Sequence, residues 1–151
     1  MTTAVITSLG MLVGLHSATS SKLAVIAGLV IMGIADGLSD AMSLHTVEEA
    51  ELEKGESKHT PREVWLTTFL AFISVFGFTL TFIIPVLIFS PKIAIIIDIV
   101  WGILLLITLN SYIAKIKKEN PLRLISEHIL LAMVVIAVSY WVGSLISMRL
   151  E

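Results

Sequence analysis

The strongest constraint on the fold is a series of long stretches with few or no charged side chains. Asp, Glu, Lys and Arg are absent from Thr2–Ser21, Val64–Phe89 and Ile129–Met148. Two further apolar stretches, Leu23–Leu44 and Ile93–Ala114, contain aspartate as their only charged residue type. A helix crosses a hydrocarbon layer with about 20 apolar residues. Because lipid offers no hydrogen bonds, the backbone of each stretch must form them internally, as a helix does. The sequence therefore predicts an all-α integral membrane protein.

Composition supports this class and excludes several others. Hydrophobic residues make up 56% of the chain and charged residues 15%, whereas soluble domains have about 25% charged residues. No basic segment precedes the first apolar stretch, so we expect a retained helix rather than a cleaved signal peptide. The absence of cysteine excludes disulfides and thiolate metal sites. There is no basic patch for nucleic acid, and no catalytic motif indicates an enzyme.

We expect one domain, residues 1–151, that is an integral membrane bundle of five transmembrane helices. The links between the first two spans and between the third and fourth are very short. The predicted spans are Thr2–Thr19, Lys22–Leu44, Val64–Phe89, Lys92–Ala114 and Leu122–Met148. An acidic connector, His45–Glu63, joins the second span to the third. Pro85 should kink the third span near its outer end, because proline lacks the backbone N–H of a helical hydrogen bond.

The distribution of basic residues predicts the orientation. Cytoplasmic loops carry an excess of Lys and Arg. One side of the predicted bundle has seven basic residues and the other three, which favours a cytoplasmic N-terminus and an external C-terminus. Short loops, together with the absence of Gln, suggest a prokaryotic plasma membrane. The seven basic residues on the predicted cytoplasmic side are Lys54, Lys58, Arg62, Lys115, Lys117, Lys118 and Arg123. The three on the predicted external side are Lys22, Lys92 and Arg149.

Glycine pairs at helical spacing predict close helix packing. Gly10 and Gly14 lie four residues apart in the first span, as do Gly33 and Gly37 in the second. Small residues at this spacing let membrane helices approach closely. Two readings are open: the pairs pack helices within one chain, or they join two copies of the chain.

Two aspartates in the second span are the strongest functional signal. Asp36 lies about 18 Å from the outer end of the span, and Asp40 about 6 Å further on. A charge at the middle of a membrane helix costs roughly 2.5–3.5 kcal/mol on insertion scales. Residues i and i+4 share a helix face, so repulsion disfavours two charged groups here unless a cation lies between them. We therefore favour a site that exchanges protons for a divalent metal over two separate structural contacts.

Further acids continue beyond the span. Glu51 falls near the same face of an extended helix, and Glu48 lies beside it. Oxygen ligands suit hard or borderline divalent ions such as Mn²⁺ and Fe²⁺. We expect the other connector glutamates to be solvated, His45 to be interfacial, and Asp98 to reach the interface or pair with Lys92. An exit-site role for Asp98 is the alternative.

The stretch GMLVGLHSATSSKLAVIAGLVIMGIADGLSDAMSLHTVEEAE resembles the start of the vacuolar iron transporter family of iron and manganese carriers. Leu12–Ser21 and Ala27–Val30 match its first two helices, and Ala41–Ser43 with Glu48 matches the core of its second-helix motif. The later part of the chain agrees more loosely. The resemblance implies a five-helix homodimer that exports Fe²⁺ or Mn²⁺, coupled to protons, along a path between subunits. It also implies a metal-path role for Glu48.

The chain departs from the family pattern at two points. Thr2 and Thr3 stand where the family's first helix has Asp-Gly. Either the start is truncated, or the Asp is missing and Asp36 or Asp40 substitutes for it. Leu44 stands where the family has a methionine, which favours Mn²⁺ or another hard ion, or else a relative that no longer transports.

The sequence hypothesis is a homodimeric, proton-coupled exporter of divalent metal with no resident cofactor. Its partners are the lipid bilayer, divalent metal ions and protons. Glu48 and Glu51 would collect the ion, and Asp36 and Asp40 would bind it. The alternative is a non-transporting metal sensor or assembly subunit in which the Asp pair is structural.

Overall fold

The computed structural model describes residues 1–19, 21–54 and 60–150, without the side chains of Glu53 and Leu150. All regular structure in these ranges is helical, as predicted. The predicted cytoplasmic residue Lys58 lies outside the described residues. The helices are α1 (Thr2–Thr19), α2 (Lys22–Glu53), α3 (Pro61–Thr81), α4 (Ile83–Ile88), α5 (Pro91–Lys117) and α6 (Pro121–Leu150).

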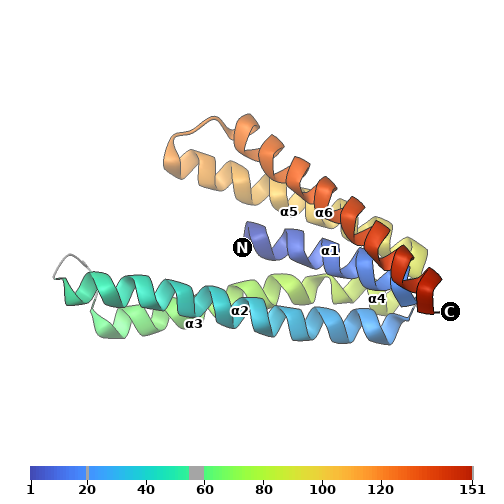
Figure 1. Ribbon diagram of the computed structural model, residues 1–151. Helices are drawn as coiled ribbons and strands as arrows, with labels where there is room; N and C mark the ends of the chain where they lie inside the picture. Colours follow the sequence, from blue (N-terminus) through green and yellow to red (C-terminus); the bar gives the residue numbers. More distant parts are fainter. Residues whose placement is uncertain (20, 55–59, 151) are drawn as a thin grey trace.

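Two long antiparallel hairpins enclose the first helix (Figure 1). One hairpin consists of α2 and α3, and the other of α5 and α6. Helix α1 lies between them and packs against α2, α5 and α6. The hairpins converge at the end that carries the C-terminus and diverge towards their other ends. The core follows from this arrangement, since Val5, Leu9 and Leu12 of α1 are fully buried.

Local sequence signals explain where the helices of the first hairpin begin and end. The Ser21 side chain accepts a hydrogen bond from the Ala24 N–H and caps α2. No Pro or Gly interrupts the chain after Leu44 before the end of α2 at Glu53, so the helix continues into the predicted connector. A capping box of Thr60 and Glu63 then starts α3, which satisfies two N–H groups at the helix start.

The predicted third span is interrupted near its C-terminal end. Helix α3 ends at Thr81, Phe82 separates it from α4, and Pro85 lies within α4. Pro85 has no N–H to donate to the carbonyl four residues earlier, and its ring clashes with that carbonyl. The predicted kink is therefore confirmed, as a break one turn before the proline.

The glycine pairs pack helices within one chain. A Cβ on Gly10 would lie 2.6 Å from Val135 of α6, and one on Gly14 would lie 3.4 Å from Ser139. Gly33 meets α3, where an added Cβ would lie 2.9 Å from Thr79. Gly37 likewise packs against Phe72 of α3. The structure thus decides between the two readings: each pair is already in contact with another helix of the same chain.

Large apolar side chains cover the outside of the bundle. Leu23, Leu122 and Met148 are each at least 70% exposed, and many others on α2, α3, α5 and α6 are more than half exposed. Soluble monomers rarely present apolar surface on this scale. Within the described ranges, four helical segments are long and apolar enough to cross a membrane: Lys22–Leu52, Pro61–Ile88, Pro91–Lys117 and Pro121–Arg149. These features indicate an integral membrane protein. Helix α1, with 18 residues, is not one of the four.

Candidate ion-binding site

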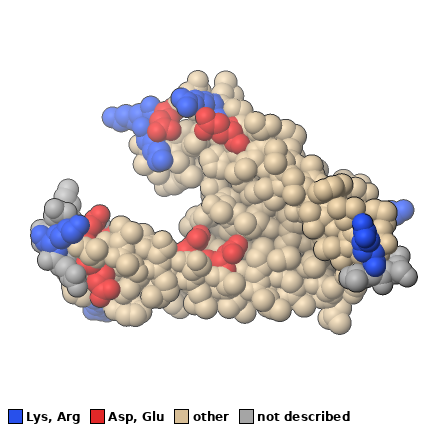
Figure 2. All heavy atoms as spheres, in the orientation of Figure 1, with Lys and Arg blue, Asp and Glu red and all other residues tan. Residues whose placement is uncertain are grey.

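An open cleft separates the two hairpins, and acidic side chains lie at its inner end (Figure 2). The acidic atoms lie over the middle of α2, where the sequence places Asp36 and Asp40. The surrounding surface carries no Lys or Arg on this face of the molecule. Basic side chains instead lie at the ends of the hairpins and at the opposite end of the bundle. The cleft therefore leads from a charged rim to an isolated pair of acids.

Asp36 contacts the first helix. Its Oδ2 accepts a hydrogen bond of 2.8 Å from the Thr7 hydroxyl of α1. The Asp36 side chain is half-buried, because α1 packs over one side of α2. One hydroxyl satisfies only a small part of a carboxylate, which has about four acceptor positions.

Asp40 lies one turn further towards the wide end of the cleft. It is exposed, and within the described ranges it has no hydrogen-bond or ion-pair partner. Neither aspartate has a basic partner in the part of the chain that the structure describes. The pair is therefore open on the side of the cleft, where a cation could reach both carboxylates.

The other two predicted metal residues lie further along α2. Glu48 is eight residues beyond Asp40, which corresponds to about 12 Å along the helix axis. One of its oxygens, Oε2, is buried without a hydrogen-bond partner among the described residues, whereas Glu51 is exposed. No group of three or more His, Asp or Glu in residues 1–19, 21–54 and 60–150 is arranged to hold a metal ion. The four predicted residues do not form one closed site within a single chain.

His45 joins the ends of α2 and α3. It is buried, its ring centroid lies 4.4 Å from that of Trp65, and its Nδ1 lies 3.0 Å from the Thr68 hydroxyl. Thr68 donates its own hydrogen to the Val64 carbonyl at 2.8 Å. The His45 Nδ1 must therefore be the donor to the Thr68 hydroxyl. The other ring nitrogen, Nε2, lies 3.9 Å from Oε2 of Glu49. His45 is thus a packed contact between two helices, and its expected interfacial position stays a prediction.

Asp98 is the buried carboxylate whose position the sequence interpretation missed. It is 0% exposed, and neither of its oxygens has a hydrogen-bond partner in the described part of the chain. The expected pairing with Lys92 is absent from the described ion pairs, and the side chain does not reach the surface. It belongs to a stripe of buried residues repeated every four positions along α5: Ala94, Asp98, Gly102, Leu106, Asn110 and Ala114. This four-residue repeat could have predicted the burial of Asp98, because a helix face that points inward places its polar residues in the core together with its apolar ones.

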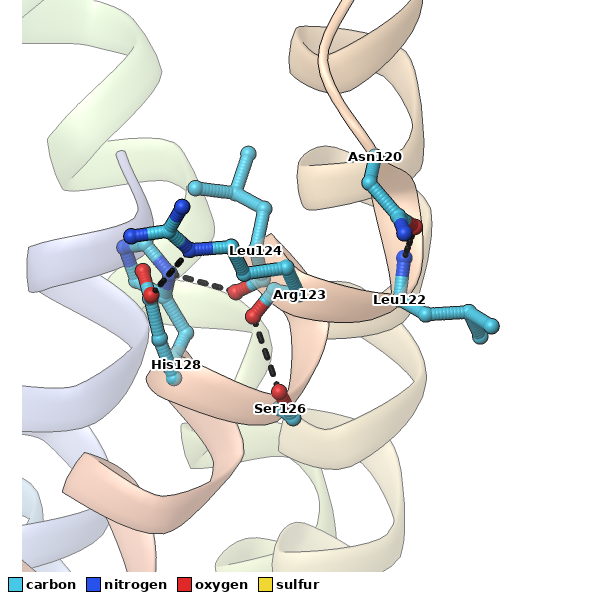
Figure 3. Close-up of polar contacts among 7 residues, drawn as sticks. Asn120, Leu122, Arg123, Leu124, Ser126 and His128 are labelled. Carbon is cyan, nitrogen blue, oxygen red and sulfur yellow. Dashed lines mark hydrogen bonds and ion pairs between the residues drawn. The ribbon is translucent and has the colours of Figure 1, made fainter.

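The polar residues at the start of α6 are satisfied locally (Figure 3). The Asn120 side chain accepts a hydrogen bond of 3.0 Å from the Leu122 N–H, and Ser126 donates to the Arg123 carbonyl at 2.9 Å. Arg123 forms an ion pair of 2.9 Å with Glu127. The His128 Nδ1 lies 2.9 Å from the Leu124 carbonyl. These groups have partners on their own helix, so this end of the hairpin is not a candidate site.

Comparison with models of known protein families, with curated proteins and with solved structures gives no match for this chain.

Proposed function

We propose that the protein is a proton-coupled carrier that exports a divalent metal ion, Mn²⁺ or Fe²⁺, from the cytoplasm. The observation that carries this proposal is the Asp36–Asp40 pair at the inner end of the cleft, which has no basic partner among the described residues. Carboxylates at membrane depth are costly, and a structural pair would be expected to have a basic partner. A divalent cation between the two side chains would neutralise both.

The cleft suggests how an ion would reach the pair. Glu48 and Glu51 follow Asp40 along α2 towards the wide end of the cleft, so they would attract cations there. The ion would then move to Asp36 and Asp40, where carboxylate oxygens and the Thr7 hydroxyl offer the hard ligands that Mn²⁺ prefers. We place this wide end in the cytoplasm, because Arg62, Lys115 and Arg123 lie at the ends of the two hairpins.

Other parts of the proposal concern assembly and topology. In the proposed topology, α1 crosses the bilayer as a fifth span, because α1 is as deeply packed as the helices around it. Two chains form the working unit, and the partner supplies the remaining ligands, since the described residues of one chain bring no three acidic or histidine side chains together. The membrane is a prokaryotic plasma membrane. The resemblance to vacuolar iron transporters is consistent with each of these features and is part of the proposal.

The test is uptake of Mn²⁺ by liposomes that contain the purified protein, with an imposed pH gradient. Replacing both Asp36 and Asp40 by Asn should abolish uptake. Glu119→Gln is the matched control, because it removes one exposed carboxylate at the end of the other hairpin and should leave uptake unchanged. Equal uptake by wild type and by the double variant would refute the proposal.

A second function is favoured by the Thr7–Asp36 hydrogen bond. If the aspartates serve mainly to join α1 and α2, the protein is a metal sensor or an assembly subunit that does not transport. One result distinguishes the two functions. A sensor or assembly subunit would bind Mn²⁺ at equilibrium without flux across the liposome membrane, whereas a carrier would show both. Competition among Mn²⁺, Fe²⁺, Zn²⁺ and Mg²⁺ in the same assay identifies the ion.

A further inference from the structure

Asp98 is buried in a different part of the molecule from the acids of the cleft. It lies on the face of α5 that packs against α1, since the neighbouring Gly102 is so close to Leu9 that an added Cβ would lie 2.7 Å from it. Both carboxyl oxygens are buried and lack partners among the described residues. A charged carboxylate in such surroundings is disfavoured more strongly than the neutral acid, because burial without a partner costs far more for a charge than for an uncharged polar group.

The groups around Asp98 offer it no permanent positive partner. Helix α1 contributes one titratable side chain on this side, His16, and α2 contributes Lys22 at its first residue. Helix α4 has no charged residue, and α3 has acids and bases only in its first turn. The charged residues of α6 lie near its two ends, and Tyr140 in its outer half is exposed. On α5 itself, Lys92 lies six residues away near the surface.

A small, largely apolar pocket begins one helical turn from Asp98. It is lined by Ala94 of α5, by His16 of α1 and by Lys22 of α2. Ala94 and Asp98 lie four residues apart on the same face of α5, so their side chains are neighbours. The His16 ring is half-buried and has no hydrogen-bond partner in the described ranges. Lys22, which also lines the pocket, donates a hydrogen bond to the Phe89 carbonyl.

We propose that Asp98 is a proton-binding site in the membrane interior, which exchanges its proton through this pocket with the side of the membrane that carries Lys22. The carboxylate takes up one proton, which a hydronium ion gives up to leave water, and becomes a neutral carboxyl group. Release reverses this step, and His16 relays the proton between the pocket and the solvent. Proton binding at Asp98 does not depend on the proposed carrier function, but the coupling of proton flow to metal transport does. In a coupled carrier, the proton would bind to Asp98 on α5 and the metal to the carboxylates on α2.

The proton site is tested by infrared spectroscopy of the full chain in liposomes. The wild type should show the C=O stretch of a protonated carboxyl group at neutral pH, and Asp98→Asn should lose it. Asp40→Asn is the matched control, because it removes a carboxylate exposed in the cleft and should retain the band. Absence of the band from the wild type, or its persistence in Asp98→Asn, would overturn the assignment.

The path is tested by the rate at which this band shifts after transfer to heavy water. His16→Leu should slow the shift at least several-fold, and an unchanged rate would overturn the relay. Coupling is tested by Mn²⁺ uptake, where Asp98→Asn should keep uptake but lose its dependence on the pH gradient. If uptake by the variant remains gradient-dependent, Asp98 is not the coupling site. If the wild type shows no uptake but retains the band, the carrier function fails and the proton site stands.

Discussion

The Thr7 hydroxyl lies 2.8 Å from Asp36 Oδ2 and joins the first helix to the second at the inner end of the cleft. The contact connects α1, which lies between the two hairpins, to one of the two acids on which the proposed function depends. It also distinguishes Asp36 from Asp40, which has no such partner in the described ranges. The two aspartates should therefore respond differently to the same substitution.

Replacing Thr7 by Val should destabilise the bundle, because it removes the hydroxyl and leaves the half-buried carboxylate without a donor. Hydrogen bonds between membrane helices contribute about 0.6 kcal/mol on average and up to about 1.7 kcal/mol. We expect a loss in this range in the free energy of unfolding, measured in mixed micelles. Thr108→Val is the control, since among the described residues the exposed Thr108 hydroxyl bonds only to the Leu104 carbonyl of its own helix. Similar losses in both variants would argue against a specific contribution from the Thr7–Asp36 bond.

The crossing of α1 and α6 should not tolerate a methyl group at Gly143. A Cβ there would collide with the Gly14 carbonyl and with the Ser17 hydroxyl. Overpacking of this kind typically costs about 1–3 kcal/mol, so Gly143→Ala should lower the free energy of unfolding by that amount. Gly77→Ala is a matched control, because an added Cβ there has no heavy atom within 4 Å. That variant should be neutral or slightly stabilised, since alanine favours a helix more than glycine does.

Asn110 should be replaceable by Leu without loss of stability. Its Nδ2 donates to the Leu106 carbonyl at 2.8 Å, but its Oδ1 is buried and has no partner among the described residues. An unsatisfied buried acceptor costs about 1–3 kcal/mol, and leucine removes it at similar side-chain size. We expect equal or higher stability of Asn110→Leu in the unfolding assay. A clear loss would mean that Oδ1 has a hydrogen-bond partner in the folded protein.

The sequence was sufficient to predict the helices but not the contacts between them. Long apolar stretches required helices, and the proline at position 85 predicted the interruption that occurs at Phe82. The fate of Asp98 depended on which face of α5 packs against α1, and a single span gives no direct information on that. For the same reason the sequence left open whether Gly33 and Gly37 pack within one chain. The candidate site was predicted in part: Asp36 and Asp40 share the cleft, but Glu48 and Glu51 lie too far along α2 to join them.

Asp40 gives the sharpest test of whether the cleft is a metal-binding site, because a carboxylate that binds metal should lower the stability of the metal-free protein and raise that of the metal-bound protein. Without metal, Asp40→Asn should unfold no more easily than the wild type, because it removes a carboxylate that has no partner in the described part of the chain and lies next to Asp36. With Mn²⁺ at about 100 times its dissociation constant, a ligand that binds only the folded state adds about 2.7 kcal/mol. The wild type should gain this stabilisation, and Asp40→Asn should lose most of it. Glu119→Gln should behave like the wild type in both conditions. If Mn²⁺ stabilises Asp40→Asn as much as the wild type, the ion binds elsewhere, and the acids of the cleft have a structural role.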